Sequence, residues 1–112
     1  MSNQNISVLT LGVVAAVALS RGRFVTGAGA YPTAGGRACR VTQWDGAIGD
    51  RVPTDVLGTA VVEAGAAIAT DTLVEVLADG RVVTQTTGVA VGRTLEPAIG
   101  AGAFIEILLI PN

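Results

Sequence analysis

The chain has 112 residues, half of them hydrophobic and only 14% charged, with a formal net charge of −2 at pH 7. Its length fits one small domain and excludes two, and its apolar content excludes a disordered, charge-rich tail. It has no histidine, and all seven of its basic residues are arginine, so it lacks the usual general base, the commonest zinc ligand and the positive surface of a nucleic-acid binder. A single cysteine excludes an intrachain disulfide. We therefore expect no enzyme, no cofactor, no metal site and no nucleic-acid partner.

The first 20 residues predict a segment of their own, a polar arm followed by the apolar run ISVLTLGVVAAVAL at residues 6–19. This run is shorter than the roughly 20 residues that a transmembrane helix needs. A signal peptide carries positive charge before its apolar part, whereas here Arg21 and Arg23 follow it. We therefore expect no membrane partner and divide the chain into an arm with an apolar segment (1–20) and a β-rich domain (21–112).

The apolar run itself leaves its conformation and its place open. Its valines favour a strand, whereas its alanines also fit a short helical turn. A run of this kind either packs into the core of its own domain or lies along a neighbouring chain. Of these two roles, we favour the core.

From residue 23 onward, short runs rich in Val, Ile and Thr alternate with Gly, Pro and Asp, a pattern typical of an all-β fold. Asp79-Gly80 predicts a hairpin with a type I′ turn. Pro53, Pro97 and Pro111 are expected at strand ends, where a missing N–H costs a sheet least. We predict a small single-domain β-sandwich or open β-barrel with an extended N-terminal arm. The predicted strands are Phe24–Thr26, Ala38–Thr42, Thr59–Glu63, Leu73–Leu77, Val82–Gln85, Gly88–Arg93 and Phe104–Ile110.

No combination of residues predicts a catalytic or metal site. Asp50 and Asp55 are close in sequence, but they flank Pro53 and predict a solvated loop rather than a carboxylate pair in a cleft. Cys39 follows Ala38, lies close to Val41 and has no histidine partner, so we expect a small buried side chain. No stretch has the spaced oxygen ligands of a calcium loop.

Four side chains of the β-rich domain are candidates for contact with a partner. Tyr31 and Trp44 either anchor a partner surface or close the end of a small sandwich. Arg21 and Arg23 either pair with carboxylates of a neighbouring chain or stay solvated.

A succession of short motifs covers about residues 23–110. It begins with Phe24-Val25-Thr26 and continues with GTAVVEAGAAI at 58–68. Val74-Glu75-Val76 then leads into the Asp79-Gly80-Arg81 turn, and GRTLEPA at 92–98 precedes a last strand at 105–109. In motif order and chain length, this succession resembles the small capsid cement, or head decoration, proteins of tailed bacteriophages.

The resemblance implies a structural protein on the outer capsid surface of the virion, made in the host cytoplasm and without catalysis. Such proteins bridge major capsid subunits, often as trimers or dimers, and stabilise the shell against internal DNA pressure. The implied partners are the major capsid protein and other copies of this chain, in a trimer rather than a dimer. Because the N-terminal arm of such proteins commonly contacts the capsid, the candidate interface also includes, by position alone, Asn3, Gln4, Asn5 and Ile6.

A second hypothesis comes from a different class of protein. The run AGAAIATDTLVEV at 64–76 resembles the small β-clip (SAF-like) domains, which bind sugars or act as periplasmic chaperones. That hypothesis predicts a sugar or an extracellular partner as the ligand, and cleavage of a leader near Ser20.

Overall fold

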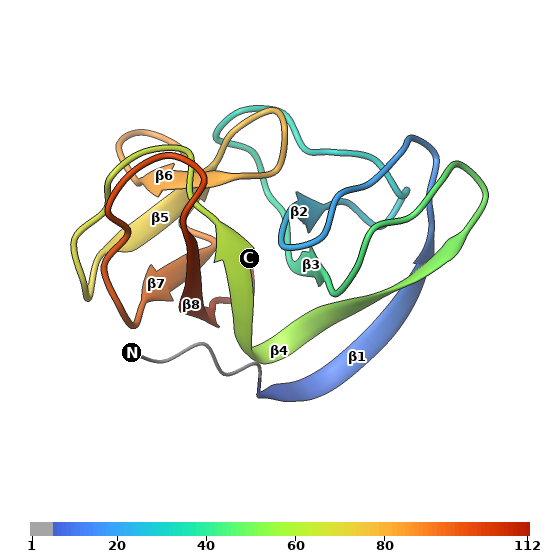
Figure 1. Ribbon diagram of the computed structural model, residues 1–112, viewed down its shortest axis with the longest axis horizontal. Coiled ribbons are helices and arrows are strands. Elements are labelled where there is room, and N and C mark those ends of the chain that lie inside the picture. The colour runs from blue at the N-terminus through green and yellow to red at the C-terminus, as the bar shows by residue number, and fades with distance from the viewer. Residues whose placement is uncertain (1–5) are drawn as a thin grey trace.

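The computed structural model describes residues 6–112 as strands, turns and loops without a helix (Figure 1). The strands form an antiparallel sheet that curls into half of a barrel, which confirms the all-β prediction and favours the open barrel over the sandwich. In chain order the eight strands of these residues are β1 (Ser7–Val14), β2 (Phe24–Val25), β3 (Arg40–Thr42), β4 (Arg51–Glu63), β5 (Leu73–Val76), β6 (Val82–Thr84), β7 (Gly92–Thr94) and β8 (Phe104–Leu109).

Strand β4 connects the two halves of the sheet. The strand order is β2-β3-β4-β8-β7-β5-β6, and β1 pairs with β4 outside this path. The first part of β4 pairs with β1 and β3, and its second part pairs with β8. Between them lies Gly58 with a φ of 101°, where a Cβ would collide with the backbone oxygen of Ile6. Glycine is therefore required where β4 passes from one half to the other.

The solvated loop predicted at Asp50–Asp55 is wrong, because β4 begins at Arg51. Pro53 lies inside this strand rather than at a strand end. It lies opposite Gly12 of β1, and on the β3 side its carbonyl accepts the Gln43 N–H at 3.1 Å, one residue beyond the last β3–β4 pair, Thr42 with Thr54. Asp55 is only 2% exposed, so the structure buries a carboxylate that we expected from the sequence to be solvated.

Two apolar cores fill the fold. The main core holds fifteen buried residues from β2 to β8 and the loops between them, with Phe24, Ile105 and Ile107 as its largest side chains. The smaller core holds five, and Tyr31 packs against it. Because side chains alternate along a strand, β2 directs Phe24 into the main core and Val25 into the smaller one. The smaller core consists of Val13, Ala15, Leu19, Val25 and Val52.

The N-terminal apolar run forms a strand over residues 7–14, but this strand is not buried. Only Val13 of β1 has less than a tenth of its surface exposed, so the prediction of a core segment is wrong for β1. It is right only for Val13 and for Ala15 and Leu19 beyond the strand. Within residues 6–112, no helix has the length and apolarity needed to cross a membrane. The exposed apolar residues of β1 are Val8, Leu9, Leu11 and Val14.

The hairpin predicted at Asp79-Gly80 is confirmed as β5–β6, but its turn type differs. Gly80 has a φ of 83° and Asp79 keeps a negative φ, whereas a type I′ turn needs both positive. The Gly80 N–H donates to the Leu77 carbonyl at 3.0 Å, and the Leu77 N–H donates to the Arg81 carbonyl at 2.8 Å. The turn is thus type I followed by a left-handed glycine.

Three further expectations from the sequence need adjustment. The strand predicted at 88–93 begins only at Gly92, and the strand predicted at 59–63 is the second part of the longer β4. Cys39 is half-buried rather than fully buried.

Candidate functional site

The outer edge of β1 is the first candidate site. Among the described residues, β1 pairs with β4 alone, and no backbone hydrogen bond joins residues 8–13 to any other segment. In an antiparallel pair, alternate residues direct their N–H and C=O groups away from the partner strand. Proteins usually protect such an edge with charges or proline, and β1 (SVLTLGVV) has neither. This edge is therefore suited to pairing with another chain.

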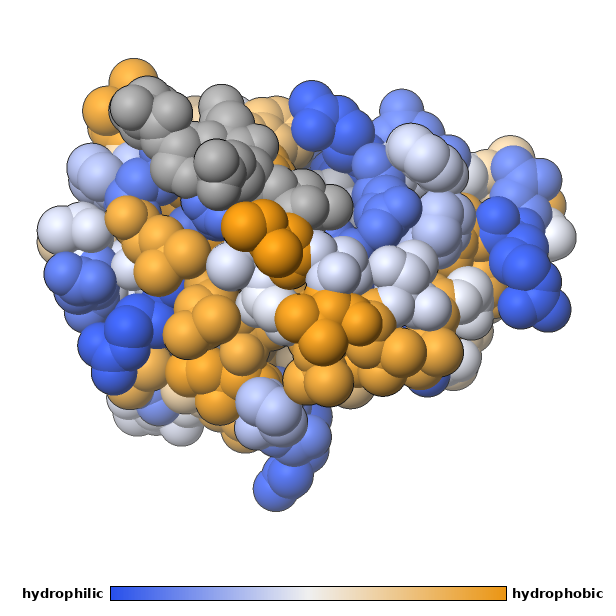
Figure 2. Space-filling model, turned by 90° about the horizontal axis from the view of Figure 1, so that it is seen from below, coloured by the Kyte–Doolittle hydropathy of each residue, from blue (hydrophilic) through white to orange (hydrophobic). Residues whose placement is uncertain are grey.

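Exposed apolar side chains continue from this edge onto the neighbouring strands. Leu57 of β4 lies opposite Leu9, and Leu108 of β8 lies opposite Thr59. Thr59 in turn exchanges hydrogen bonds with the backbone of Ile6, whose N–H donates to the Thr59 hydroxyl at 2.9 Å. Figure 2 shows hydrophobic residues gathered on this face of the molecule. We call this set the β1 patch: Ile6, Val8, Leu9, Leu11, Leu57 and Leu108, each between 38% and 74% exposed.

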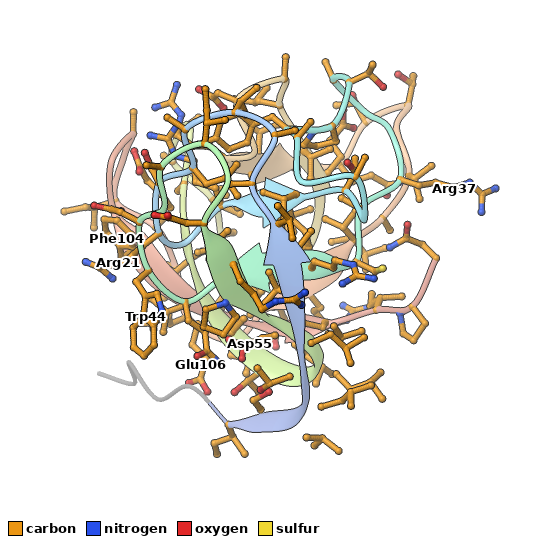
Figure 3. All side chains as sticks on the ribbon, turned by 90° about the vertical axis from the view of Figure 1, so that its right-hand side faces the viewer. Arg21, Arg37, Trp44, Asp55, Phe104 and Glu106 are labelled. Atoms are coloured by element: carbon orange, nitrogen blue, oxygen red, sulfur yellow. The ribbon has the colours of Figure 1, made fainter. Side chains whose placement is uncertain are left out.

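A groove of about 410 Å³ is the second candidate site. Trp44 is 60% exposed beside it, and Arg21 places its guanidinium carbon 4.4 Å from the centre of the Phe104 ring. This distance is that of a cation–π contact, which holds the charge over an aromatic face. Figure 3 shows these three side chains together at one side of the molecule. The groove is lined by Arg21, Gly22, Thr42, Gln43, Trp44, Asp55, Val61 and Phe104.

The groove also contains a buried carboxylate. Asp55 lines it, and one of its oxygens accepts a hydrogen bond from the Gln43 side-chain amide at 2.5 Å. Neither Asp55 nor the Arg21 side chain has an ion-pair partner among residues 6–112. A buried carboxylate with a single hydrogen bond is costly to desolvate, so this part of the groove favours a ligand that donates further hydrogen bonds.

The structure brings together only two of the candidates proposed from sequence, Arg21 and Trp44, and both line the groove. Ile6 belongs to the β1 patch. Tyr31 packs against the smaller core and its hydroxyl accepts the Ser20 N–H at 2.9 Å, which fits the role of closing the fold rather than anchoring a partner. Three further candidates, Asn3, Gln4 and Asn5, lie outside the described residues.

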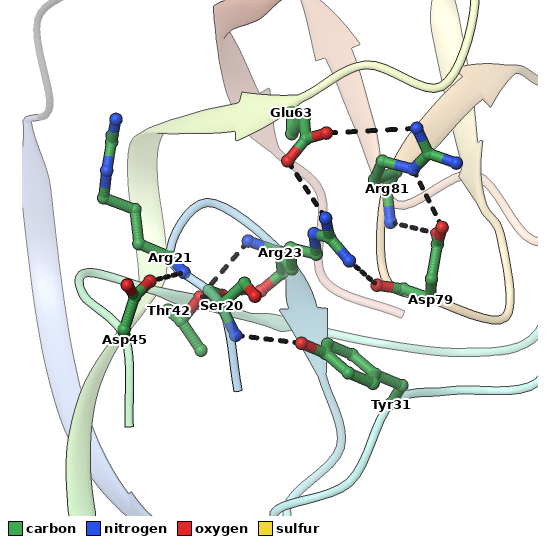
Figure 4. Close-up of polar contacts among 9 residues, drawn as sticks. All are labelled: Ser20, Arg21, Arg23, Tyr31, Thr42, Asp45, Glu63, Asp79 and Arg81. Atoms are coloured by element: carbon green, nitrogen blue, oxygen red, sulfur yellow. Dashed lines mark hydrogen bonds and ion pairs between the residues drawn. The ribbon is translucent and has the colours of Figure 1, made fainter. Parts of the chain in front are cut away.

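Arg23 pairs within its own chain, in contrast to the expected pairing with a neighbour or with solvent. Its guanidinium donates to Glu63 at 3.2 Å and to the Asp79 carbonyl at 3.3 Å (Figure 4). Arg81 bonds the Asp79 carboxylate at 2.8 Å and lies 3.9 Å from Glu63. This network ties β2 to the end of β4 and to the β5–β6 turn.

Two carboxylates owe perturbed pKa values to such local contacts. Hydrogen bonds from the backbone of Thr86 and Gly88 hold the pKa of Glu75 below its ordinary value. Burial raises the pKa of Asp79, but hydrogen bonds from Arg81 and the charges of Arg81 and Arg23 together bring it below its ordinary value. Both carboxylates therefore act as structural acceptors. Among residues 6–112, no three side chains of the His, Cys, Asp and Glu types gather to hold a metal ion.

Sequence analysis missed most of the groove. Asp55 was assigned to a loop because it follows Pro53. Gln43 and Phe104 lie in no motif, and Val61 belongs to the GTAVVEAGAAI run at 58–68, which carries no signal for a groove. Two signals in the sequence point to this region: Trp44, as the only tryptophan of an aromatic-poor chain, and Arg21, as a charge after the apolar run.

The comparisons with known proteins bear on the fold. No protein-family model and no curated protein matches the chain. Among solved structures, the chain is similar to the crystal structure of the head fibre gp8.5 N base in bacteriophage phi29, with a TM-score of 0.74 and 18% sequence identity. The match covers 91% of this chain and 93% of that chain. At this identity the likeness shows a shared fold, and both the cement-protein and the β-clip hypotheses stay predictions.

Proposed function

We propose that the chain is a structural protein of a tailed-bacteriophage head that attaches to the outer surface of the assembled shell. The β1 patch carries this proposal, because it joins exposed apolar side chains to a strand edge with which no other strand of residues 6–112 pairs. The shared fold with a protein described as part of a phage head fibre supports the same role. The role needs no catalytic residue.

The proposed contacts are with the major capsid protein and with further copies of this chain. Burial of apolar surface contributes about 25 cal/mol per Å², so a patch of modest size gives each copy a modest affinity. A shell displays many identical sites, so many such contacts form on it. Each bound copy links neighbouring subunits, and the stabilisation from all copies adds up over the whole shell.

Co-sedimentation with heads tests the attachment. Purified protein is mixed with expanded, undecorated heads from its own source, the heads are pelleted, and bound copies are counted per capsid subunit. We expect a saturable, fixed ratio and slower disruption of the decorated heads on heating. Absence of binding to heads confirmed as intact would overturn the proposal.

Charged variants of the patch localise the contact. Leu9→Lys and Leu11→Lys each introduce a charge into the β1 patch, and we expect at least a tenfold loss of head binding because a buried, unpaired charge is costly. Ile99→Lys is the matched control, since Ile99 is 94% exposed and not part of the patch. Equal loss in all three variants, or in none, would remove the β1 patch from the contact.

Sedimentation equilibrium tests contact between copies separately. We expect a mass of three chains that falls towards one chain in Leu11→Lys. A mass of one chain at all concentrations would contradict the contact between copies. It would not bear on the contact with the shell, which co-sedimentation tests.

A further inference from the structure

We infer that the groove beside Trp44 binds a neutral saccharide. This function goes beyond attachment to a head and uses none of the residues of the β1 patch.

The charges of the groove indicate a ligand without net charge. Among the lining residues, Arg21 brings one positive charge and Asp55 one negative charge, and in residues 6–112 neither side chain has an ion-pair partner that would cancel it. The Asp45 carboxylate, next to Trp44 in the sequence, is not part of the lining and accepts the Arg21 backbone N–H at 2.8 Å. An anion would meet the Asp55 carboxylate, and a cation would meet the Arg21 guanidinium. A neutral ligand meets neither repulsion, and it still gains charge-assisted hydrogen bonds from both groups.

The hydrogen-bonding groups indicate a ligand that both donates and accepts. Arg21 only donates, the Asp55 carboxylate only accepts, and the Gln43 amide does both. Asp55 is 2% exposed and has one hydrogen bond from Gln43, so it retains acceptor capacity towards the groove. Hydroxyl groups satisfy all three side chains, because each hydroxyl is a donor and an acceptor.

The aromatic walls indicate a ligand with an apolar face. Trp44 is 60% exposed, although an aromatic side chain of this size gains most by burial. Phe104 offers its ring to the groove with Arg21 on it. A pyranose ring presents C–H groups on one face and hydroxyls around its rim, which matches an aromatic wall next to polar groups. The volume of about 410 Å³ lies within the range of small-molecule sites and accommodates one or two sugar rings.

The chain contains its own reporter for this site. Trp44 is the only tryptophan, so a change in tryptophan emission comes from the groove alone. The protein is titrated with three neutral trisaccharides: maltotriose, cellotriose and fully N-acetylated chitotriose. We expect a saturable change in emission with at least one of them, with a dissociation constant of about 1 mM because the groove is open to solvent.

Variants assign the binding to the groove. Arg21→Gln removes the positive charge and keeps a hydrogen-bonding amide, Asp55→Asn removes the negative charge at nearly constant volume, and we expect each to weaken binding by about tenfold. Arg37→Gln is the matched control, because Arg37 is also an exposed arginine and Figure 3 shows it at the opposite side of the molecule. Trp44→Ala, followed by calorimetry, is expected to abolish binding. Circular dichroism verifies the fold of Asp55→Asn, and the exposed Arg21 variant tests the site even if Asp55→Asn unfolds.

Several results would overturn the inference. These are no response to any neutral trisaccharide up to about 10 mM, tighter binding of trigalacturonate or trilysine, or binding that survives the Arg21 and Asp55 variants. A response to the peptide MSNQN in place of the sugars would assign the groove to residues 1–5 of a chain. An emission change with protein concentration alone would assign it to contact between copies. None of these measurements involves phage heads, so the saccharide site and head attachment succeed or fail independently.

Discussion

The two parts of the sheet are built in opposite ways. The part around β8, β7, β5 and β6 surrounds the main core of fifteen buried apolar residues, whereas the part around β1 has a core of five. β1 instead holds most of its apolar side chains in solvent. Apolar surface that is not used to stabilise the fold is available for a partner. The larger part therefore maintains the fold, and the part around β1 is the one to which we assign the proposed contacts.

The largest effect is expected from the cores. Ile107→Ala in the main core should cost about 4 kcal/mol of the free energy of unfolding, and Leu19→Ala in the smaller core about 2 kcal/mol. The difference arises because the smaller core relaxes more easily around a cavity. Urea denaturation followed by circular dichroism measures both. Equal losses would show that the two parts contribute alike, and the comparison would fail.

The ion network between the parts should give an intermediate effect. Glu63→Gln removes the charge that pairs with Arg23 at 3.2 Å, and we expect a loss of about 1–2 kcal/mol because both side chains are about four-fifths buried. Thermal and urea unfolding measure it, with Arg37→Gln as an exposed control. A loss no greater than that of the control would show that apolar packing alone joins the strands here.

Acidification should give a smaller effect within the larger part. The pKa values of Glu75 and Asp79 are lower in the folded chain than in the unfolded chain. The stability that these two carboxylates contribute is therefore fully present above their unfolded pKa values, and it is lost as the pH falls through the lower, folded values. We expect the melting temperature to fall below about pH 4. In Glu75→Gln this fall should be shallower, and an unchanged profile would count against Glu75 as a structural acceptor.

The smallest effect on stability is expected in β1. Leu9→Lys and Leu11→Lys should change the free energy of unfolding by no more than about 0.5 kcal/mol, because each leucine is 40% exposed and the lysine stem covers the same surface. Their loss of head binding should nevertheless be large. A variant that unfolded instead would show that β1 maintains the fold as well, and would blur the distinction between the two parts.

Local signals explain which elements were predictable from the sequence. The β5–β6 hairpin follows from Asp79-Gly80 between two apolar runs, and the last strand from a run at 104–110 that is apolar except for Glu106. The first part of β4 was missed because Asp50, Pro53 and Asp55 are turn formers in isolation. Pairing with β1 and β3 overrides that preference.

The candidate sites were harder to predict because they depend on distant contacts. The groove takes Arg21, Trp44, Asp55 and Phe104 from four separate segments, and no sequence spacing relates them. The sequence equally does not show that β1 is exposed. An apolar strand has the same composition whether a core or a partner covers it, and only the sheet order shows that its second edge has no neighbour among the described residues.

The continuity of β4 has a mechanical consequence for a protein attached by β1. Hydrogen bonds in an antiparallel pair lie perpendicular to the strands. A force along β1 therefore shears all of its bonds to β4 together, whereas a force across the pair opens them one after another. In the first case the load passes along one covalent backbone, through Gly58, into the part of β4 that contributes to the main core. The attachment of β1 to the fold is thus stronger against tension directed along β1 than against tension across the pair.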